Sequence, residues 1–318
     1  MKLAINGFGR IGRTFYRAAD DKLDIAAIND LGDVENLKYL LKYDTVYGVY
    51  DKEPKEKFLA ENDPEKLPWS EMGVDLVLES SGFFTKKADA EKHLKAGAKK
   101  VLITAPSESA DITIIPGVND DKYDPEKHRI ISMGSCTTNC IVPLVQVLNK
   151  HFKIIKGSFT TTHSYTATQA LVDRPDKKDF RRGRSAAENI VPTTTGASKA
   201  IYQVFPELTG KIGSFAVRIP TPTVSLVDFT CEVEKEIDSK TVNDAFEKEV
   251  GNMKGALAIS AESLVSTDFR GNPHGAILDA ELTSVTEKKL VHVVAWYDNE
   301  MGYSHRLVEM CKIIQQKG

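Results

Sequence analysis

The chain has 318 residues, of which 41% are hydrophobic and 27% are charged, and its formal net charge at pH 7 is −3. This length is sufficient for two domains with sizeable cores, and it excludes a single small module. The nearly balanced charge excludes a general electrostatic attraction to nucleic acid or to membranes, and no stretch approaches the ~20 apolar residues of a membrane span.

The first predicted element is a short strand at Lys2–Asn6. Because the chain enters this strand without the apolar core and cleavage site of a signal peptide, we expect a cytoplasmic protein. The strand leads into a glycine-rich turn, GFGRIG, which precedes a helical pattern at Thr14–Asp20. In a dinucleotide-binding fold these glycines allow close approach of the backbone to pyrophosphate, and the helix N-terminus supplies N–H groups. The turn therefore predicts cofactor contacts from Gly7, Gly9, Arg10, Ile11 and Gly12.

A second predicted strand, Ile25–Ile28, leads to Asp30, about 20 residues beyond the glycines, as the dinucleotide fingerprint requires. The carboxylate of Asp30 can accept hydrogen bonds from ribose hydroxyls, and its charge would repel a 2′-phosphate. Asp30 therefore favours NAD over NADP. A turn-forming aspartate without a ligand is the alternative interpretation.

The rest of the first domain alternates between helical and strand patterns. We predict a helix at 33–43, a charged surface connection at 51–71, a strand at 74–79, a helix at 88–95, and strands at 101–104, 112–118 and 130–133. This alternation predicts a parallel sheet with helices on both faces, and ligands bind at the carboxyl ends of such strands. Ser81 and Thr104 lie in loops at these ends, so we expect both to contact the cofactor.

The motif SCTTNC at 135–140 lies between the last of these strands and a helix predicted at 141–148. A cysteine at the start of a helix lies beside unpaired N–H groups at the positive end of the dipole, which favours the thiolate. We therefore predict that Cys136 is a nucleophile, although a buried cysteine is often only a small apolar side chain. Cys140, one turn later, either packs inward or resolves an oxidised Cys136. Pro143 predicts a kink or a later start of the helix.

The four cysteines in this long chain do not resemble a disulfide framework, and no CxxC or histidine-rich spacing predicts a metal site.

After Phe152 the composition shifts toward alternating and β-branched segments, at 157–165, 215–217, 224–233 and 290–296. These segments predict a mostly antiparallel sheet, with helices at 185–203 and 242–250 and a long polar loop at 173–184. A C-terminal helix at 303–315 is expected to pack on the first domain. The prediction is an α/β Rossmann dinucleotide-binding domain at 1–135 and 300–318, and an α+β catalytic domain at 136–299.

Seven motifs together resemble phosphorylating glyceraldehyde-3-phosphate dehydrogenase. In chain order they are GFGRIGR, IND, SCTTNC, TTTHSYTATQ, TTTGASKA, VRIPTP and WYDNEMGYS. The resemblance covers essentially the whole chain. It implies a homotetramer that oxidises glyceraldehyde 3-phosphate to 1,3-bisphosphoglycerate with NAD and inorganic phosphate.

On the matching positions, the resemblance implies that Cys136 is the nucleophile and His163 its base partner. It implies that Asn299 holds the nicotinamide carboxamide, and we add Tyr303 to the expected cofactor contacts. The implied substrate and phosphate contacts are Ser135, Thr137, Thr166, Arg182, Thr195, Gly196 and Arg218. Arginine suits this role because its planar guanidinium binds phosphate through paired donors.

Two departures from the family pattern matter. The region Tyr50–Glu65 is shorter than is usual, as though a hairpin of the cofactor domain were missing. Arg174 precedes Pro175 where NAD-specific members tend to carry a small or apolar residue. An arginine near the adenosine ribose could receive a 2′-phosphate, so use of NADP beside NAD stays open.

Two alternative functions stay open at this point. Erythrose-4-phosphate dehydrogenase shares the fold and the cysteine motif, but it releases the acyl group with water rather than phosphate. A non-catalytic dinucleotide-binding redox sensor would use Cys136 and Cys140 as an oxidisable pair. The full set of nucleophile, base and anion sites argues against a sensor, which needs no phosphate pockets.

Overall fold

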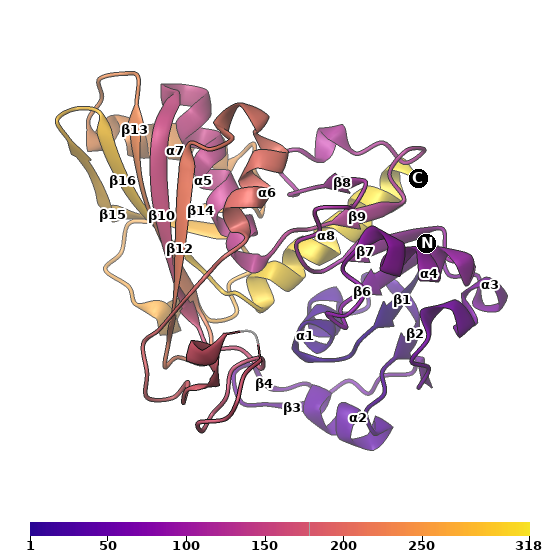
Figure 1. The fold of residues 1–318 in the computed structure, drawn as a ribbon. Coiled ribbons are helices and arrows are strands. Elements are labelled where there is room, and N and C mark those ends of the chain that lie inside the picture. Colours follow the sequence, from indigo (N-terminus) through magenta and orange to yellow (C-terminus); the bar gives the residue numbers. More distant parts are fainter. Residues whose placement is uncertain (178) are drawn as a thin grey trace. The chain divides into compact units, whose positions relative to one another are not determined.

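The computed structural model describes residues 1–177 and 179–318. Lys178, which belongs to the charged part of the predicted loop, lies outside the described residues. The chain forms two compact units, one made of Met1–Ser135 and Ser304–Gly318 and the other of Cys136–Tyr303 (Figure 1). Within the described residues, no helix combines the length and the apolar character needed to cross a membrane.

The first unit is built on a parallel sheet of seven strands in the order β5-β2-β1-β6-β7-β9-β8. Its strands are β1 (Lys2–Asn6), β2 (Asp24–Asn29), β5 (Lys57–Leu59), β6 (Leu76–Glu79), β7 (Lys100–Ile103), β8 (Ile112–Thr113) and β9 (Ile130–Ser132). Each neighbouring pair is parallel. The central strands are buried and mostly apolar apart from their end residues, as strands covered on both faces must be. The predicted α/β dinucleotide-binding fold is confirmed.

The helices of this unit are α1 (Arg10–Ala19), α2 (Val34–Lys42), α3 (Trp69–Met72), α4 (Lys87–Lys95) and most of α8 (Met301–Lys317). Helix α1 begins at Arg10, earlier than the predicted start at Thr14, because the glycine turn leads directly into its first turn. Gly7, at φ +94°, supplies the left-handed backbone that this turn needs. The Ser304 hydroxyl of α8 donates to the Thr14 hydroxyl of α1 at 2.8 Å.

Two predictions for the first unit are wrong. The segment 51–71, expected to be a surface connection, contains edge strand β5, a 3₁₀ helix (Pro64–Lys66) and helix α3, whose Trp69 is fully buried. Its prolines and charges concealed these short elements. The strand expected at 112–118 ends at Thr113, and the following residues form turns. A small ribbon of β3 (Tyr43–Asp44) and β4 (Gly48–Val49) completes this unit.

The second unit contains a sheet of seven strands in the order β11-β12-β10-β13-β16-β15-β14. Its strands are β10 (Ile154–Ser164), β11 (Val191–Thr193), β12 (Ile212–Ile219), β13 (Ser225–Val233), β14 (Leu257–Ser260), β15 (Ala276–Thr286) and β16 (Leu290–Tyr297). The pairs β10–β12 and β14–β15 are parallel, and the other neighbouring pairs are antiparallel. The prediction of a mostly antiparallel sheet is confirmed, although β14 and β15 were not foreseen.

The helices of the second unit are α5 (Cys136–Phe152), α6 (Ala197–Val204) and α7 (Ser239–Val250). Helix α5 begins at Cys136 and continues through Pro143, so the later start that this proline suggested is wrong. The helix predicted at 185–203 is wrong in its first part, where strand β11 lies. Pro192 within that stretch disfavours a helix interior and suits a short edge strand.

Candidate active site and dinucleotide pocket

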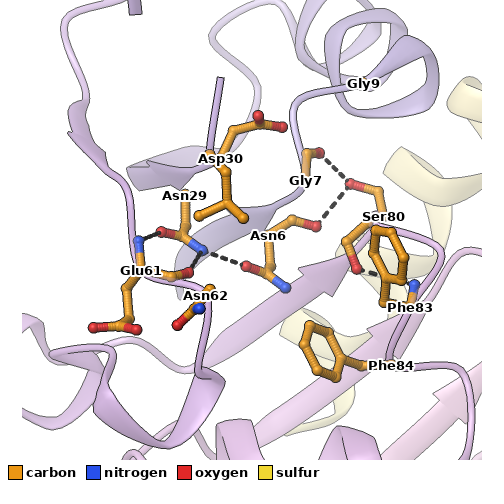
Figure 2. Close-up of a pocket in the computed structure, with 12 residues that line it drawn as sticks. Asn6, Gly7, Gly9, Asn29, Asp30, Glu61, Asn62, Ser80, Phe83 and Phe84 are labelled. Carbon is orange, nitrogen blue, oxygen red and sulfur yellow. Dashed lines mark hydrogen bonds between the residues drawn. The ribbon is translucent and has the colours of Figure 1, made fainter. Parts of the chain in front are cut away.

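A cavity of about 500 Å³ lies in the first unit, at the carboxyl ends of β1, β2 and β6 (Figure 2). This is where ligands bind in a parallel sheet with helices on both faces. Its lining residues are Asn6, Gly7, Gly9, Asn29, Asp30, Leu31, Glu61, Asn62, Ser80, Ser81, Phe83 and Phe84. Four predicted cofactor residues, Gly7, Gly9, Asp30 and Ser81, are therefore brought together.

The glycine turn has two different physical requirements. A Cβ added at Gly7 would collide with the backbone of Ser81, and a Cβ added at Gly12 would collide with the Gly7 carbonyl, so these two glycines permit close packing. A Cβ at Gly9 would meet no atom within 4 Å. Gly9 is also the N-cap of α1 and makes no side-chain cap hydrogen bond. The open space beside Gly9, at the N-terminus of α1, fits the pyrophosphate of a dinucleotide.

Asp30 is held in a fixed orientation at the pocket. Its Oδ2 accepts a hydrogen bond from the Phe8 backbone N–H at 2.6 Å, and its Oδ1 accepts one from the Gly32 N–H at 2.8 Å. A carboxylate has about four acceptor positions, so two such bonds leave capacity for ribose hydroxyls. The free acceptor positions and the charge of this carboxylate fit the ribose hydroxyls of NAD.

The other predicted cofactor residues of this unit have different surroundings. Arg10 forms an ion pair with Asp44, and neither Arg10 nor Ile11 is part of the cavity lining. The Thr104 hydroxyl donates to the Glu79 carbonyl at 3.1 Å. Sequence reasoning missed Asn6 and Asn29, the polar residues that end β1 and β2, although Asn29 stands in the IND motif that it had identified.

In the second unit, Cys136 and His163 form a close pair. Cys136 is the first residue of α5, and His163 lies near the end of β10. Their Sγ and Nε2 atoms are 3.3 Å apart, and His163 is only 4% exposed. A thiol within hydrogen-bond reach of an imidazole is the arrangement of an activated nucleophile.

Arg218 lies beside this pair because β12 places it directly opposite His163 in the parallel register with β10. Its Nη1 donates to the Ser164 carbonyl at 2.9 Å, and His163 Nδ1 lies 2.7 Å from the same oxygen. Nη1 and Nδ1 are 2.6 Å apart, because both N–H groups point at one carbonyl. With its proton on Nδ1, the ring directs the lone pair of Nε2 toward Cys136.

Burial dominates the titration of the pair. It raises the pKa of the Cys136 thiol, while the Arg218 charge and the Thr137 N–H act in the lowering direction. This net direction is opposite to the one expected from the helix start, because loss of hydration outweighs the helix N–H groups. Burial, followed by the Arg218 charge, lowers the pKa of His163 to about 3. His163 is therefore neutral at pH 7 and can accept a proton.

Tyr297, which sequence reasoning missed, supports the same centre. Its hydroxyl lies 2.9 Å from Thr137 Oγ1 and 2.8 Å from Thr161 Oγ1. Its ring meets the His163 ring edge to face, with the centroids 5.9 Å apart. The signal was available, because Tyr297 belongs to the WYDNEMGYS motif. The hydroxyl of Thr137, a predicted phosphate contact, is therefore bonded to Tyr297.

Arg182 lines a second cavity of about 780 Å³, together with Thr193 and Thr194. Its Nε donates to Thr193 Oγ1 at 2.9 Å and lies 3.5 Å from Asp179 Oδ2. Burial has the largest effect on the pKa of His163 and on the pKa of Arg218. The positive charge of Arg182 has a smaller effect, which also lowers both pKa values. Arg182 thus belongs electrostatically to the Cys136 centre.

The remaining predicted anion contacts occupy loops. Thr195 Oγ1 accepts a hydrogen bond from the Ala197 N–H at 3.2 Å, and Gly196 precedes α6 as its N-cap. Thr166 Oγ1 lies 2.9 Å from Thr168 Oγ1. Ser135 directly precedes α5.

Asn299 and Tyr303, the expected cofactor contacts of the last motif, are each 4% exposed. Asn299 Oδ1 accepts a hydrogen bond from Ser225 Oγ at 3.0 Å, and Ser225 Oγ accepts one from the Ser164 N–H at 3.1 Å. Ser225 therefore connects the Asn299 amide to the strand end that carries His163. Within residues 1–177 and 179–318 there is no group of three or more His, Cys, Asp or Glu side chains that could hold a metal ion.

Comparison with known proteins gives two family matches. Residues 1–87 match the model described as glyceraldehyde 3-phosphate dehydrogenase, NAD binding domain. Residues 135–299 match the C-terminal domain of the same enzyme.

Curated relatives match along the whole chain. The glyceraldehyde-3-phosphate dehydrogenase of Geobacillus stearothermophilus is 51% identical over 333 aligned positions, which cover 100% of this chain and 99% of the relative. Glyceraldehyde-3-phosphate dehydrogenase 1 of Bacillus subtilis is 50% identical over the same coverage. The Streptomyces coelicolor enzyme is 49% identical over 98% of this chain and 97% of its own.

Proposed function

This chain belongs to the glyceraldehyde-3-phosphate dehydrogenase family, and from that premise we propose that Cys136 and His163 carry out its chemistry. The protein oxidises glyceraldehyde 3-phosphate to 1,3-bisphosphoglycerate with NAD and inorganic phosphate. The observation that carries the proposed residue roles is the 3.3 Å approach of Cys136 Sγ to His163 Nε2, with Arg218 beside them.

In the proposed mechanism Cys136 gives its proton to neutral His163 and adds to the aldehyde carbon, and His163 returns that proton to the former carbonyl oxygen, which completes the thiohemiacetal and leaves His163 neutral again. Bound NAD supplies the acceptor for the hydride that leaves this carbon. His163 accepts the proton of the hemiacetal hydroxyl as the thioester forms. Inorganic phosphate then attacks the thioester carbon, and the sulfur of Cys136 leaves as a thiolate.

The two phosphates require two anion sites. Arg218 suits one of them because it adjoins the reacting pair and its Nε is buried without a hydrogen-bond partner in the part of the chain that the structure describes. Arg182 suits the other, with Thr195 and Gly196 at the start of α6 as further phosphate contacts. Charge-assisted hydrogen bonds from arginine to phosphate are among the strongest in proteins.

The test follows NADH formation with glyceraldehyde 3-phosphate, with and without inorganic phosphate, in the wild type and in Cys136→Ser. Phosphate-dependent turnover that disappears in the variant supports the proposal. Turnover that is indifferent to phosphate would instead favour hydrolytic release, as in erythrose-4-phosphate dehydrogenase. No turnover in the wild type would favour the redox sensor.

The proposal also includes a homotetramer and a cytoplasmic location. Exposed apolar side chains of the second unit, such as Leu171, Val172 and Phe180, support self-association, since each is at least 66% exposed. Sedimentation velocity would contradict the tetramer if the chain sediments as a monomer at micromolar concentration.

NADP use through Arg174 is a separate proposal that tests the cofactor preference. Arg174→Ala should lower kcat/KM for NADP and leave kcat/KM for NAD unchanged. A strong NAD preference in the wild type that the variant does not alter would dismiss NADP use.

A further inference from the structure

Three buried residues lie behind the lining of the dinucleotide pocket. Glu79 ends β6, His93 lies on α4 and Trp69 begins α3, and their exposed fractions are 1%, 0% and 0%. The proposed chemistry uses none of them. A buried carboxylate is costly unless several donors satisfy it, so its partners are informative.

The side chain of Glu79 accepts hydrogen bonds on both of its carboxylate oxygens. Oε2 accepts from Asn6 Nδ2 at 2.6 Å and from His93 Nε2 at 3.0 Å. Oε1 accepts from the Ser81 backbone N–H at 2.9 Å and from the Ser81 hydroxyl. The 3.4 Å approach of Asn6 Nδ2 to His93 Nε2 follows from two donors that converge on one oxygen. Glu79 therefore binds two residues of the pocket lining, Asn6 and Ser81, from behind.

Trp69 determines which nitrogen of His93 carries the proton. Its indole N–H can only donate, and it lies 3.0 Å from His93 Nδ1. Nδ1 must therefore accept, so the ring proton is on Nε2 and is donated to Glu79. The His93 ring also meets the pocket residue Phe84 edge to face, with the centroids 6.2 Å apart.

The fixed direction continues across the floor of the pocket (Figure 2). Because Asn6 Nδ2 donates to Glu79, its Oδ1 is turned to Asn29, whose Nδ2 donates to it at 2.7 Å. Asn29 Nδ2 also donates to the Glu61 carbonyl at 2.8 Å, and Asn29 Oδ1 accepts from the Glu61 N–H at 2.9 Å. Each amide thus has one orientation, set by the Glu79 carboxylate for Asn6 and by the Glu61 backbone for Asn29.

We infer that Trp69, His93 and Glu79 are positioning residues for dinucleotide binding, because they fix the hydrogen-bond direction of Asn6 and the conformation of the Ser81 turn. This inference rests on the proposed use of NAD. A pocket whose amides are already oriented loses less freedom when the ligand binds, and this increases affinity without a direct contact.

The test compares two variants at one position. His93→Leu removes the acceptor of Trp69 and one donor to Glu79, so KM and Kd for NAD should rise roughly tenfold while kcat at saturating NAD is nearly unchanged. His93→Gln keeps an acceptor and a donor on one group, and it should restore most of the affinity. Kd is measured by titration of the full-length protein with NAD, and thermal unfolding is recorded for each variant.

Val101→Ala is the matched control, because Val101 is fully buried in β7 of the same unit and packs in an apolar cluster with Ala90, Ile103 and Ile130. It should lower the melting temperature without a change in KM for NAD. If His93→Leu does not fold, Trp69→Phe decides, because it removes the indole N–H but keeps an aromatic ring in the core, and it should weaken NAD binding severalfold.

Unchanged NAD affinity in the folded variants would overturn the inference, even if their melting temperatures fall. A failure of the wild type to bind NAD would instead contradict the cofactor use on which the inference rests. The two failures are therefore distinguishable.

Discussion

The dinucleotide pocket of the first unit and the Cys136 centre of the second satisfy their buried polar groups in different ways. Behind the pocket, Glu79, His93 and Asn6 pair with one another and with the pocket lining. At the Cys136 centre, by contrast, Arg218 Nε is buried without a hydrogen-bond partner among the described residues. The first region is organised in advance of its ligand, whereas the second retains polar capacity that an anionic substrate can satisfy.

The ionisable groups of the Cys136 centre are also affected by their burial. Burial lowers the pKa of Arg218 and of His163 and raises that of Cys136, so each group of the centre is shifted toward its neutral form. A buried cation without a hydrogen-bonded anion is unfavourable, and a phosphate beside Arg218 would offset that cost. Binding of the substrate phosphate is therefore expected to be favourable beside the reacting residues. The dinucleotide pocket, in contrast, has polar groups that are already oriented before the cofactor binds.

The largest expected effect is a loss of turnover that leaves NAD binding unchanged. Cys136→Ser should lower kcat by roughly 10⁴-fold or more, since a serine hydroxyl beside His163 is a far weaker nucleophile. The Kd for NAD should stay at the wild-type value. Residual phosphate-dependent turnover near the wild-type rate would contradict the assignment of Cys136, and a large loss of NAD affinity would contradict the separation of the two regions.

The second largest effect is expected from substitution of Arg218, whose buried guanidinium is proposed to bind the substrate phosphate. Arg218→Leu should lower kcat/KM for glyceraldehyde 3-phosphate by roughly 100-fold, because the substrate phosphate loses a charge-assisted, paired donor. Arg218→Lys keeps the charge without the planar fork and should recover only part of the loss. KM for NAD should not change in either variant. Steady-state kinetics with each substrate varied in turn provides the measurement, and equal loss for both substrates would contradict an anion site.

A smaller effect is expected from substitution of Asp30, which tests its role in cofactor binding. Asp30→Asn keeps the size of the side chain but removes its charge, so KM for NAD should rise roughly tenfold while kcat is nearly unchanged. The discrimination against NADP should fall, because repulsion of the 2′-phosphate disappears. The ratio of kcat/KM for NAD to that for NADP is the direct readout, and an unchanged ratio would show that Asp30 does not set the preference.

The contrast between the regions also explains what the sequence could predict. Gly7, Gly9 and Asp30 were predictable because the strand–turn–helix unit that unites them is local, and its spacing carries its chemistry. Cys136 and His163 are 27 positions apart in the sequence, at the start of a helix and near the end of the following strand, and no local rule joins them. The pairing of these two residues was predicted only from the resemblance to a known family.

The contacts behind the pocket were beyond sequence reasoning for a related reason. Trp69 lies in a charged, proline-rich segment that was interpreted as a surface connection, and His93 belongs to a helix whose other residues are mostly charged. Only the three-dimensional meeting of α3, α4 and β6 gives these residues a common role. Similarly, the Arg218 effect on His163 arises from sheet register, which alternation of residues does not determine.

The smallest effect concerns a satisfied polar cluster in the second unit, at the opposite end of α5 from Cys136. Glu249, 4% exposed, accepts hydrogen bonds from Lys150 Nζ and His151 Nε2, each at 2.8 Å. Burial alone would raise the pKa of Glu249, but hydrogen bonds from Lys150, His151 and Asn252 lower it from 4.5 to about 2. Because this folded-state pKa is depressed, the stabilisation is present above pH 4.5 and is lost as the pH falls toward 2.

Glu249→Gln should therefore lower the free energy of unfolding at pH 7 by about 1 kcal/mol, a value reduced by the solvent exposure of Lys150. The difference between variant and wild type should shrink at pH 3, where the unfolded-state carboxyl is already protonated. Urea unfolding at the two pH values measures it, with Lys240→Ala as a control for an exposed ion pair. Because this cluster is satisfied by the protein itself, kcat and both KM values should remain unchanged, and a fall in kcat would contradict the view that the cluster contributes to stability alone.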